Sequence, residues 1–550
     1  MKSIQGFLLT SLIFSYPLSV SAQVDFDRLV KEQQNNDSNS RQENKIEKKD
    51  VYSSVEKTSV IDNTNIPEEK QCIKINELVI GNNFLRSTEI KKMQQDMVGS
   101  CLGVQGIGQL AANLQDYIIN LGYATTRVET PDQDLSLGRL VLMIKPGRIE
   151  NVIIENNDVK SWILPFGKED ILNIRNIEQG LENLQKVSGV DIKINIEPGS
   201  QNGYSNIVIN TNRTKRWDAR LSFNNWGDES TGRNIVGGTG YLYNLAKMSD
   251  IFYLSGSTST TSDYTNISTY YSVPFGFWDY ELFYSNSRSR QGVNISSMDL
   301  DYVGKSEYLS LKASRTLYRD KDKKITGFTE IFRRKSGYKL DGIELKLQKR
   351  DMGNIRFGVN YKQNFVGSAL DAALSYQRFV TWFGGTETPD MKSGDVKPAS
   401  HIVNLDTNYI KLLDLKPFNA YYNLRLGGQY SLSELTLQDQ FTLGSRWNVR
   451  GFENSTGIYG DKGFYIQNTV SFMTGFKDAE LYFGADYGQV AKSNYSQTKY
   501  NSKKLMGVVT GVKGSFSTLG YDFSLSAPLL YPDELDTDSL NVNFNLFYQF

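Results

Sequence analysis

An alternation of apolar and polar residues runs through the C-terminal three-fifths of the chain. In "NIRFGVNYK", the residues Ile355, Phe357, Val359 and Tyr361 share one face, while polar residues and glycine share the other. "YLSLKAS", "DAALSYQ" and the closing "NVNFNLFYQF" repeat this period, with Phe547 as the one exception. Successive side chains of a β-strand point to opposite faces, so a period of two predicts strands. We therefore predict strands from about residue 213 to residue 550.

Helical spacing is found only before this region. Apolar residues from Ile107 to Leu121 recur every three or four positions, which predicts a helix, and Ser87 can cap an earlier helix that ends near Val98. With strands predicted at 72–80, 123–129 and 139–145, residues 70–147 form a β-α-α-β-β unit. Residues 148–212 form a second α+β unit, because the strand "RIENVIIEN" precedes the helix "RNIEQGLENLQ" and a hairpin.

The N-terminus has the pattern of an export signal. Lys2 precedes the apolar stretch Phe7–Phe14, and Val20-Ser21-Ala22 offers small residues for cleavage. We predict a signal peptide at 1–22, with an uncleaved anchor as the alternative. No later run of 18 apolar residues exists, so the sequence predicts no transmembrane helix.

Two polar segments follow the signal. "VDFDRLVKEQQ" predicts a short amphipathic helix within residues 23–35, with Phe26, Leu29 and Val30 on one side. Residues 36–69 are rich in Asn, Ser, Lys, Glu and Asp and hold only isolated apolar residues, which predicts a flexible linker.

Composition favours a barrel over a soluble β-sandwich. Lys+Arg and Asp+Glu both number 61, so no nucleic-acid partner is indicated, while 12% of residues are aromatic and 32 are Tyr. In an exported chain, alternation over 337 residues (214 to 550) without a helix predicts a transmembrane β-barrel in outer-membrane lipid. About 20 residues per strand and connection gives roughly 16 strands. Phe550, Tyr548 and Leu546 would end it with the apolar signal that barrel assembly machinery reads; a core strand that happens to end in Phe is the alternative.

Cys72 and Cys101 are the only cysteines. In an exported chain an even pair predicts a disulfide, and two buried free thiols are the alternative.

Four stretches, in order, resemble the outer-membrane transporters of two-partner secretion, which include haemolysin activators, filamentous-haemagglutinin exporters and contact-dependent-inhibition exporters. "GYATTRVETPDQDLSLGRLVLMIKPGRIENV" resembles the first periplasmic POTRA domain of that family, and "LNIRNIEQGLENLQ" with "IEPGSQNGYSNIVI" resembles the second. "YSVPFGFWDY" is similar to its early barrel hairpin. "FTLGSRWNVRGFENSTGIYGDKGFY" is similar to its long extracellular loop six, expected at about 440–465. The chain departs from the family at Gly444-Ser445, where relatives often have paired glycines, and at "YIQNTV", where they often have a glutamate.

The resemblance implies a membrane β-barrel preceded by two POTRA domains and a plug helix in the lumen. It implies export of one large exoprotein (an adhesin, a haemolysin or a contact-dependent toxin) without ATP, by a monomer that is not an enzyme and needs no cofactor. An outer-membrane assembly factor of the same superfamily is the alternative, although such factors usually carry more POTRA domains. A barrel hydrolase is a weaker alternative, because His401 is the single histidine and no residue around it is recognisable as a nucleophile.

The resemblance also assigns a pair of charges. The loop-six box is Val449-Arg450-Gly451-Phe452, followed by the Gly460-Asp461 element. In the family, the arginine of this box pairs with an aspartate on an inner wall strand, which corresponds here to Asp486 in "YFGADYG". The strand period independently turns Asp486 toward the lumen. The alternative is an exposed arginine on a mobile loop and an unrelated aspartate.

Overall fold

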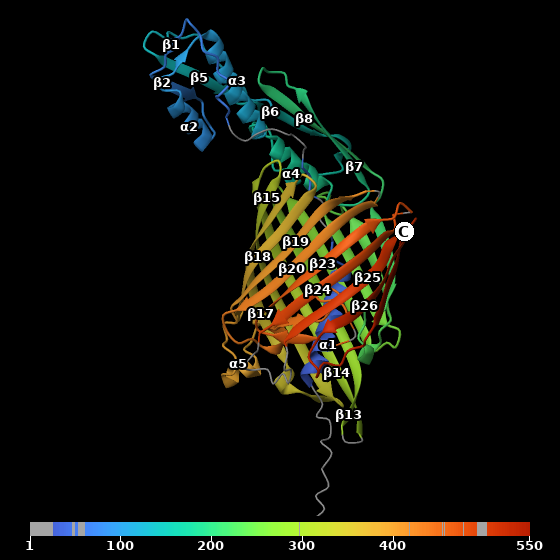
Figure 1. Ribbon diagram of the computed structural model, residues 1–550. Helices are drawn as coiled ribbons and strands as arrows, with labels where there is room; N and C mark the ends of the chain where they lie inside the picture. The colour runs from blue at the N-terminus through green and yellow to red at the C-terminus, as the bar shows by residue number, and fades with distance from the viewer. Residues whose placement is uncertain are drawn as a thin grey trace, which may run out of the picture.

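The computed structural model describes residues 26–46, 50–52, 61–295, 298–416, 418–453, 455, 457–476, 478–491 and 503–550. The predicted signal peptide (1–22) and the first three residues of the predicted plug segment (23–25) lie outside this range. The described chain forms a closed barrel with helix α1 (Phe26–Glu43) inside it and two small α/β domains beyond one rim (Figure 1). No helix in the described residues is long and apolar enough to cross a bilayer.

Sixteen antiparallel strands make the barrel, as predicted, and the two-residue strand β16 (Ile343–Glu344) pairs with one of them at the far rim. The chain closes on itself where β27 pairs with β9. The sixteen strands are β9 (Trp217–Asn224), β10 (Ile235–Tyr243), β11 (Ile251–Ser259), β12 (Tyr264–Phe275), β13 (Trp278–Ile295), β14 (Met298–Arg319), β15 (Lys323–Leu340), β17 (Arg350–Phe365), β18 (Ser368–Val380), β19 (Ile402–Leu415), β20 (Phe418–Ser431), β23 (Gly463–Met473), β24 (Glu480–Val490), β25 (Lys504–Phe516), β26 (Leu519–Leu530) and β27 (Asn541–Gln549).

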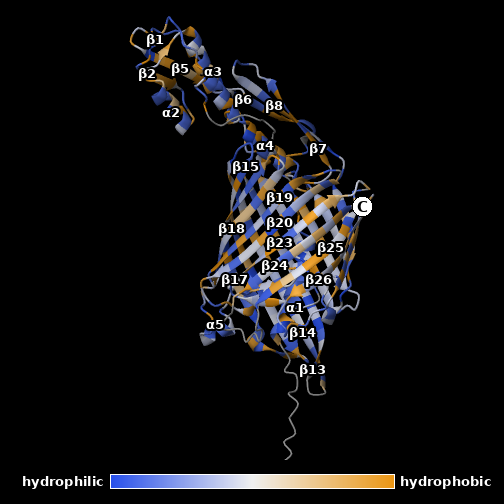
Figure 2. Ribbon diagram, in the orientation of Figure 1, coloured by the Kyte–Doolittle hydropathy of each residue, from blue (hydrophilic) through white to orange (hydrophobic). Residues whose placement is uncertain are grey.

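The two faces of the wall differ in polarity. On β13 the side chains of Leu282 and Tyr284 are exposed on the outside, while those of Ser285 and Ser287, at the alternate positions that follow, are buried on the inside. Figure 2 shows the resulting interleaving of apolar and polar residues along the strands. This is the arrangement a barrel needs in lipid, since its backbone groups are paired in the wall and its apolar side chains face the acyl chains.

The first small domain has a three-stranded sheet of order β2-β5-β4, formed by β2 (Glu77–Gly81), β5 (Arg139–Lys145) and β4 (Arg127–Glu129). The helices α2 (Thr88–Asp96) and α3 (Val104–Asn120) cover it, and Ser87 caps α2 as predicted. The predicted strand at 72–80 is divided into β1 (Ile73–Lys74) and β2, and β4 begins four residues later than predicted.

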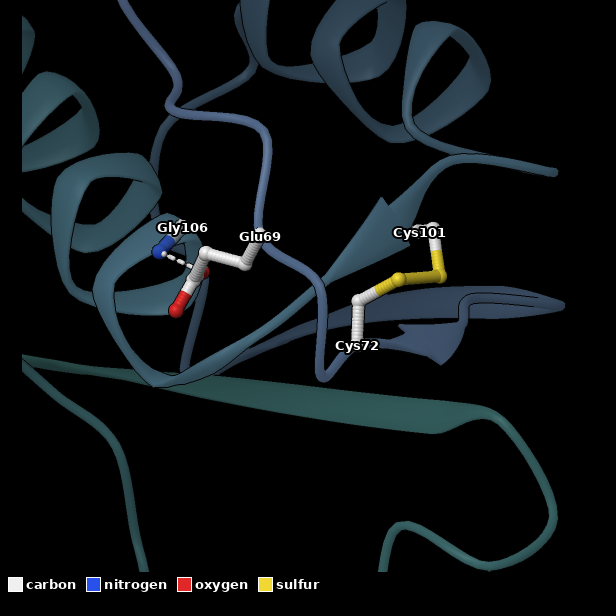
Figure 3. Close-up of a disulfide and its surroundings, with 4 residues drawn as sticks. All are labelled: Glu69, Cys72, Cys101 and Gly106. Carbon is white, nitrogen blue, oxygen red and sulfur yellow. Dashed lines mark hydrogen bonds between the residues drawn. A yellow bond between two sulfur atoms is a disulfide. The ribbon is translucent and has the colours of Figure 1, made fainter.

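A disulfide joins Cys72, which precedes β1, to Cys101 at the start of β3 (Cys101–Leu102) (Figure 3). Next to it, the Glu69 carboxylate accepts hydrogen bonds from the backbone N–H groups of Gln105 (3.1 Å) and Gly106 (2.7 Å). Gly103, the N-cap of α3, has no side chain to satisfy these donors, so Glu69 supplies the cap from outside the helix.

The structure departs from the predicted flexible linker (36–69) at both ends. Helix α1 continues to Glu43, eight residues beyond its predicted end at 35. At the other end, Ile61 is buried in the core of the first small domain, and the Asn113 amide donates to the Asp62 carbonyl oxygen (2.6 Å). A flexible linker was predicted because a segment this polar cannot build an apolar core. The two ends of the segment are nevertheless ordered, because their residues bind polar partners in the lumen and on the surface of the first small domain.

The second small domain has a sheet of order β6-β8-β7, formed by β6 (Arg148–Ile154), β8 (Tyr204–Arg213) and β7 (Val190–Pro198). The short 3₁₀ helices η1 (Glu155–Asn157) and η2 (Ser161–Ile163) precede α4 (Ile174–Leu184). The domain rests on the barrel rim, where the Asn183 amide donates to the Gly276 carbonyl oxygen (2.7 Å) and Lys186 pairs with Asp279. The strands β6 and β7 remain at the sheet edges.

Candidate functional site in the barrel lumen

Helix α1 lies inside the barrel, where hydrogen bonds hold most of its length and apolar packing of Phe26, Leu29 and Val30 holds its N-terminal end. Its buried side chains are Val30, Lys31, Glu32, Gln33, Asn36, Asp37 and Ser40, of which only Val30 is apolar. Asn36 donates to Thr231 Oγ1 (3.0 Å) and accepts from the Asp228 N–H (3.0 Å). Asp37 accepts from the Tyr264 hydroxyl (3.1 Å). The polar side chains of the lumen thus provide the hydrogen-bond partners that water would otherwise provide to this helix.

The second occupant of the lumen is the segment between β20 and β23, residues 432–462, which is loop six. It begins about eight residues earlier than the predicted range of 440–465. Inside it, η6 (Leu437–Asp439) is followed by β21 (Phe441–Leu443), which pairs with β22 (Ile458–Gly460). Its apolar residues pack on the wall strands β24 and β25 and on the connection between β26 and β27. The cluster is formed by Leu443, Val449, Phe452, Ile458, Val490, Leu505 and Leu535.

Arg450 of this loop contacts Asp486 of β24 through a two-point ion pair. Arg450 Nε lies 2.7 Å from Asp486 Oδ2, and Nη2 lies 2.7 Å from Oδ1. The side chain of Arg450 is 12% exposed and that of Asp486 is 0% exposed. Asp486 also accepts from the backbone N–H groups of Arg450 (3.0 Å) and Asn468 (3.2 Å). Arg450 Nη2 donates further to the Asn468 carbonyl and to Thr469 Oγ1, both at 3.0 Å.

Glycines let the loop approach the wall this closely. A Cβ atom on Gly484 of β24 would overlap the Arg450 guanidinium and lie 2.7 Å from the Asn468 carbonyl oxygen. Gly451 has φ +104°, and a Cβ there would lie 2.6 Å from the Ala527 carbonyl oxygen. Sequence reasoning did not single out Gly484, although glycine inside a strand often marks close approach of another backbone.

The remaining predicted loop residues lie in two places. Val449 and Phe452 are fully buried on either side of the ion pair. Gly460 and Asp461 lie at the base of the loop, where Asp461 Oδ1 accepts from the Leu435 N–H (3.3 Å) and the Gln440 amide (3.2 Å). They are therefore separate from the Arg450 contact and connect the start of loop six to its end.

Hydrogen bonds also join loop six to helix α1. Lys31 Nζ donates to Thr442 Oγ1 (3.1 Å) and to the Gln440 carbonyl oxygen (3.3 Å). Trp447 Nε1 donates to Asn39 Oδ1 (2.9 Å). Both residues of α1 were outside the apolar face that identified the helix, and Asn39 was in the predicted linker.

At the rim beside the small domains, the segment after α1 contacts a cluster of charges. Asp50 lies 3.0 Å from Lys324 and 2.5 Å from Lys362, both on barrel strands. Burial alone would raise the pKa of Asp50, but these two ammonium groups outweigh it and hold that pKa below its usual value. Lys324 also pairs with Glu182 of α4, so the segment, the second domain and the barrel meet at one point.

Comparison with known proteins identifies the family. Residues 203–514 match the family described as haemolysin secretion/activation protein ShlB/FhaC/HecB. The chain belongs to this family. Residues 73–147 match its ShlB-type POTRA domain, and residues 148–198 match a second POTRA domain.

Relatives cover most of the chain. The outer membrane transporter CdiB-2 of Burkholderia pseudomallei is 30% identical over 471 residues, which are 82% of this chain and 79% of that one. The hemolysin transporter protein ShlB of Serratia marcescens is 26% identical over 444 residues, 77% of each chain. The solved structure of CdiB from Escherichia coli superimposes with a TM-score of 0.82 at 23% identity, covering 97% of this chain and all of that one.

The chain is thus a two-partner secretion transporter of the outer membrane, with its POTRA domains in the periplasm. The family is not enzymatic, and it exports a partner exoprotein. The resemblance in sequence, the predicted fold and the predicted location are confirmed.

Proposed function

We propose that this transporter exports one large exoprotein through the lumen by moving helix α1, which closes the path at rest together with loop six. The observation that carries the proposal is that α1 is held mainly by polar contacts: six of its seven buried side chains are polar. Apolar packing is confined to its N-terminal end, at Phe26, Leu29 and Val30. Each hydrogen bond contributes only about 1 kcal/mol net, because water or an entering polar chain can replace the partner. A helix retained in this way can leave the lumen at modest cost, whereas an apolar plug would have to expose its surface to water.

Loop six has a different role in this proposal. Its apolar cluster and the Arg450–Asp486 pair fasten it to β24 and β25, so it fixes one side of the path. The contacts from Lys31 and Trp447 then connect the departing helix to this fixed loop. Withdrawal of α1 breaks these contacts while the ion pair stays in place.

The exoprotein would first be held on the POTRA domains. The edge strand β7 spans nine residues and offers one unpaired row of backbone N–H and C=O groups. An extended segment can pair with such an edge by β-augmentation, whatever its side chains. The α4 contacts with the rim would keep that edge close to the entrance.

We also propose that the C-terminal strand directs insertion of the barrel. Tyr548 and Phe550 are 41% and 53% exposed on the outer face, and Leu546 precedes them on the same face. They form an apolar terminus that assembly machinery can recognise before the barrel closes. Removing Phe550 should lower the amount of folded barrel in the outer membrane without changing export per folded molecule.

A tethering experiment tests the plug. Asn36 and Thr231 are hydrogen-bonded, so cysteines at both positions can be joined by a short thiol cross-linker in intact outer membranes. Cross-linking should stop export of the partner exoprotein, and a cleavable linker should restore it on cleavage. The controls are the two variants that carry only one of the added cysteines, and the wild type, all treated identically. They are needed because the cleaving agent also reaches the Cys72–Cys101 disulfide. Undiminished export by the cross-linked protein would refute the proposal.

A further inference from the structure

The outer face of β13, β14 and β15 carries several cationic side chains in the half of the barrel far from the POTRA domains, four of which lie around one cross-strand pair (Figure 1). We call Arg288, Arg290, Lys305 and Lys335 the basic surface. They point outward, because they alternate with buried residues such as Ser287 and share a face with the exposed Tyr284 and Leu309.

Two of these cations face each other in the strand ladder. Arg288 of β13 is the direct cross-strand partner of Lys305 of β14. Arg290 pairs with Asp301 (2.7 Å) and Lys335 lies 3.7 Å from Glu307, but neither Arg288 nor Lys305 has an ion-pair partner within the described chain. Like charges directly opposite in a ladder destabilise it. An anion placed between them would remove this cost.

The position of this pair relates it to the membrane. Two rows closer to the periplasm, the cross-strand pair Tyr284 and Leu309 is exposed and apolar, and Leu282 with Leu311 follows. Four residues separate Arg288 from Tyr284, which is about 13 Å along a strand. The pair therefore lies just outside the lipid-facing apolar residues, on the cell-exterior side, where the headgroups of the outer leaflet begin.

The surface beside the pair is open. Lys305 pairs on its other side with Gly337 of β15, and a Cβ there would have nothing within 4 Å. A bulky headgroup can therefore reach both cations from the side of β15 while its acyl chains lie along Leu309 and Leu311.

We propose that the basic surface binds the phosphate of a phosphorylated glycolipid of the outer leaflet. The Arg288 guanidinium can hold two phosphate oxygens in a fork, and the Lys305 ammonium provides a second positive charge. A lipid fits better than a free anion because the apolar residues adjoining the pair contact its chains. It also fits better than an acidic segment of the exoprotein, whose path lies inside the barrel.

The test uses the full chain, purified in a neutral detergent. Diphosphorylated lipid A is the probe, with phosphatidylcholine and inorganic phosphate as comparison additives. We expect lipid A to remain bound in native mass spectrometry and to raise the melting temperature of the wild type, while neither additive does so. The double variant Arg288→Gln, Lys305→Gln should bind lipid A at least tenfold more weakly.

A matched control removes the same charge elsewhere. Lys392 and Lys397 are exposed in the loop around α5 (Pro389–Ser393), on the same side of the membrane. The variant Lys392→Gln, Lys397→Gln should bind lipid A like the wild type. Equal weakening of lipid A binding in both double variants would show that only net charge matters, and it would overturn the proposal. Equal binding of lipid A by the wild type and both double variants would overturn it too. So would a rise in the wild-type melting temperature with inorganic phosphate alone.

A single substitution separates binding from folding. Lys305→Glu places an acid opposite Arg288, so the lipid-free barrel should melt at the same temperature or higher. Its response to lipid A should nevertheless be lost. Retention of the lipid A response in this variant would also overturn the proposal.

Discussion

Removing either member of the Arg450–Asp486 pair should release loop six from the wall and reduce export. Arg450→Ala leaves the carboxylate of Asp486, which is 0% exposed, with only two backbone N–H donors. Breaking such a shielded pair costs about 3–5 kcal/mol, because the remaining charge stays buried without its partner. At about 1.4 kcal/mol for each factor of ten, the population of the fastened loop should fall by a factor on the order of 10² to 10³ relative to its released forms.

The assay is a four-member alanine cycle in outer membranes. Export of the exoprotein is normalised to the amount of transporter, and limited proteolysis reports whether loop six has left the lumen. The barrel should remain heat-modifiable in every variant, because its wall is closed by strand hydrogen bonds that neither side chain provides. Since the two residues act as one unit, the double variant should be little worse than either single one.

The control is another arginine of the lumen. Among the residues that the structure describes, the Arg425 side chain on β20 makes one long hydrogen bond, 3.4 Å to Gln467, so Arg425→Ala should leave export and the protease pattern nearly unchanged. Strictly multiplicative export losses across the cycle, or a protease pattern that stays the same when Arg450 is removed, would refute the reasoning.

Three further outcomes are expected. Deleting residues 23–43 should raise single-channel conductance in planar bilayers more than deleting 23–35, because the helix extends to Glu43; equal conductance would place its second half outside the path. Gly484→Ala should reproduce the export defect of Arg450→Ala, because the added Cβ overlaps the Arg450 guanidinium. The control Gly428→Ala, whose Cβ would make only ordinary contacts, should not. Wild-type export by the Gly484→Ala variant would show that the loop can shift without loss of export. Glu69→Ala should lower the unfolding free energy of the first POTRA domain by about 1 kcal/mol in denaturant titrations, with no change in barrel melting, because it removes the cap of α3. An unchanged midpoint would mean that water replaces the cap.

Much of the fold could be predicted because it depends on local periodicity. The wall strands alternate over long stretches, and the strand Arg139–Lys145 has the predicted bounds. Even the exception in the last strand has a local reason: Phe547 faces the lumen, where the Arg220 guanidinium lies 4.3 Å from its ring and Gly520 opposite leaves room.

The lumen could be predicted only in part, because its packing is polar. Asn36, Asp37 and Ser40 are buried, yet in sequence they look like a solvated linker. Apolar periodicity predicts a helix only where one face of the helix packs on an apolar surface. The second half of α1 packs on polar groups, so its sequence has no apolar period from which a helix could be predicted. The Arg450–Asp486 contact was assigned by family resemblance, since no local pattern relates residues 36 positions apart on a loop and a strand.

The short distance along the chain between α1 and the first POTRA domain has a kinetic consequence. Only residues 44–60 separate the end of α1 at Glu43 from Ile61 in the core of that domain. A chain of this length spans at most about 60 Å, roughly twice the ~27 Å length of the helix, so a helix that moves as proposed above would clear the lumen without detaching. Its return would then be an intramolecular reaction with a rate that does not depend on how many transporters the cell makes. Each transporter would reseal by itself after every passage, and the permeability of the outer membrane would follow the number of exoproteins in transit rather than the number of barrels.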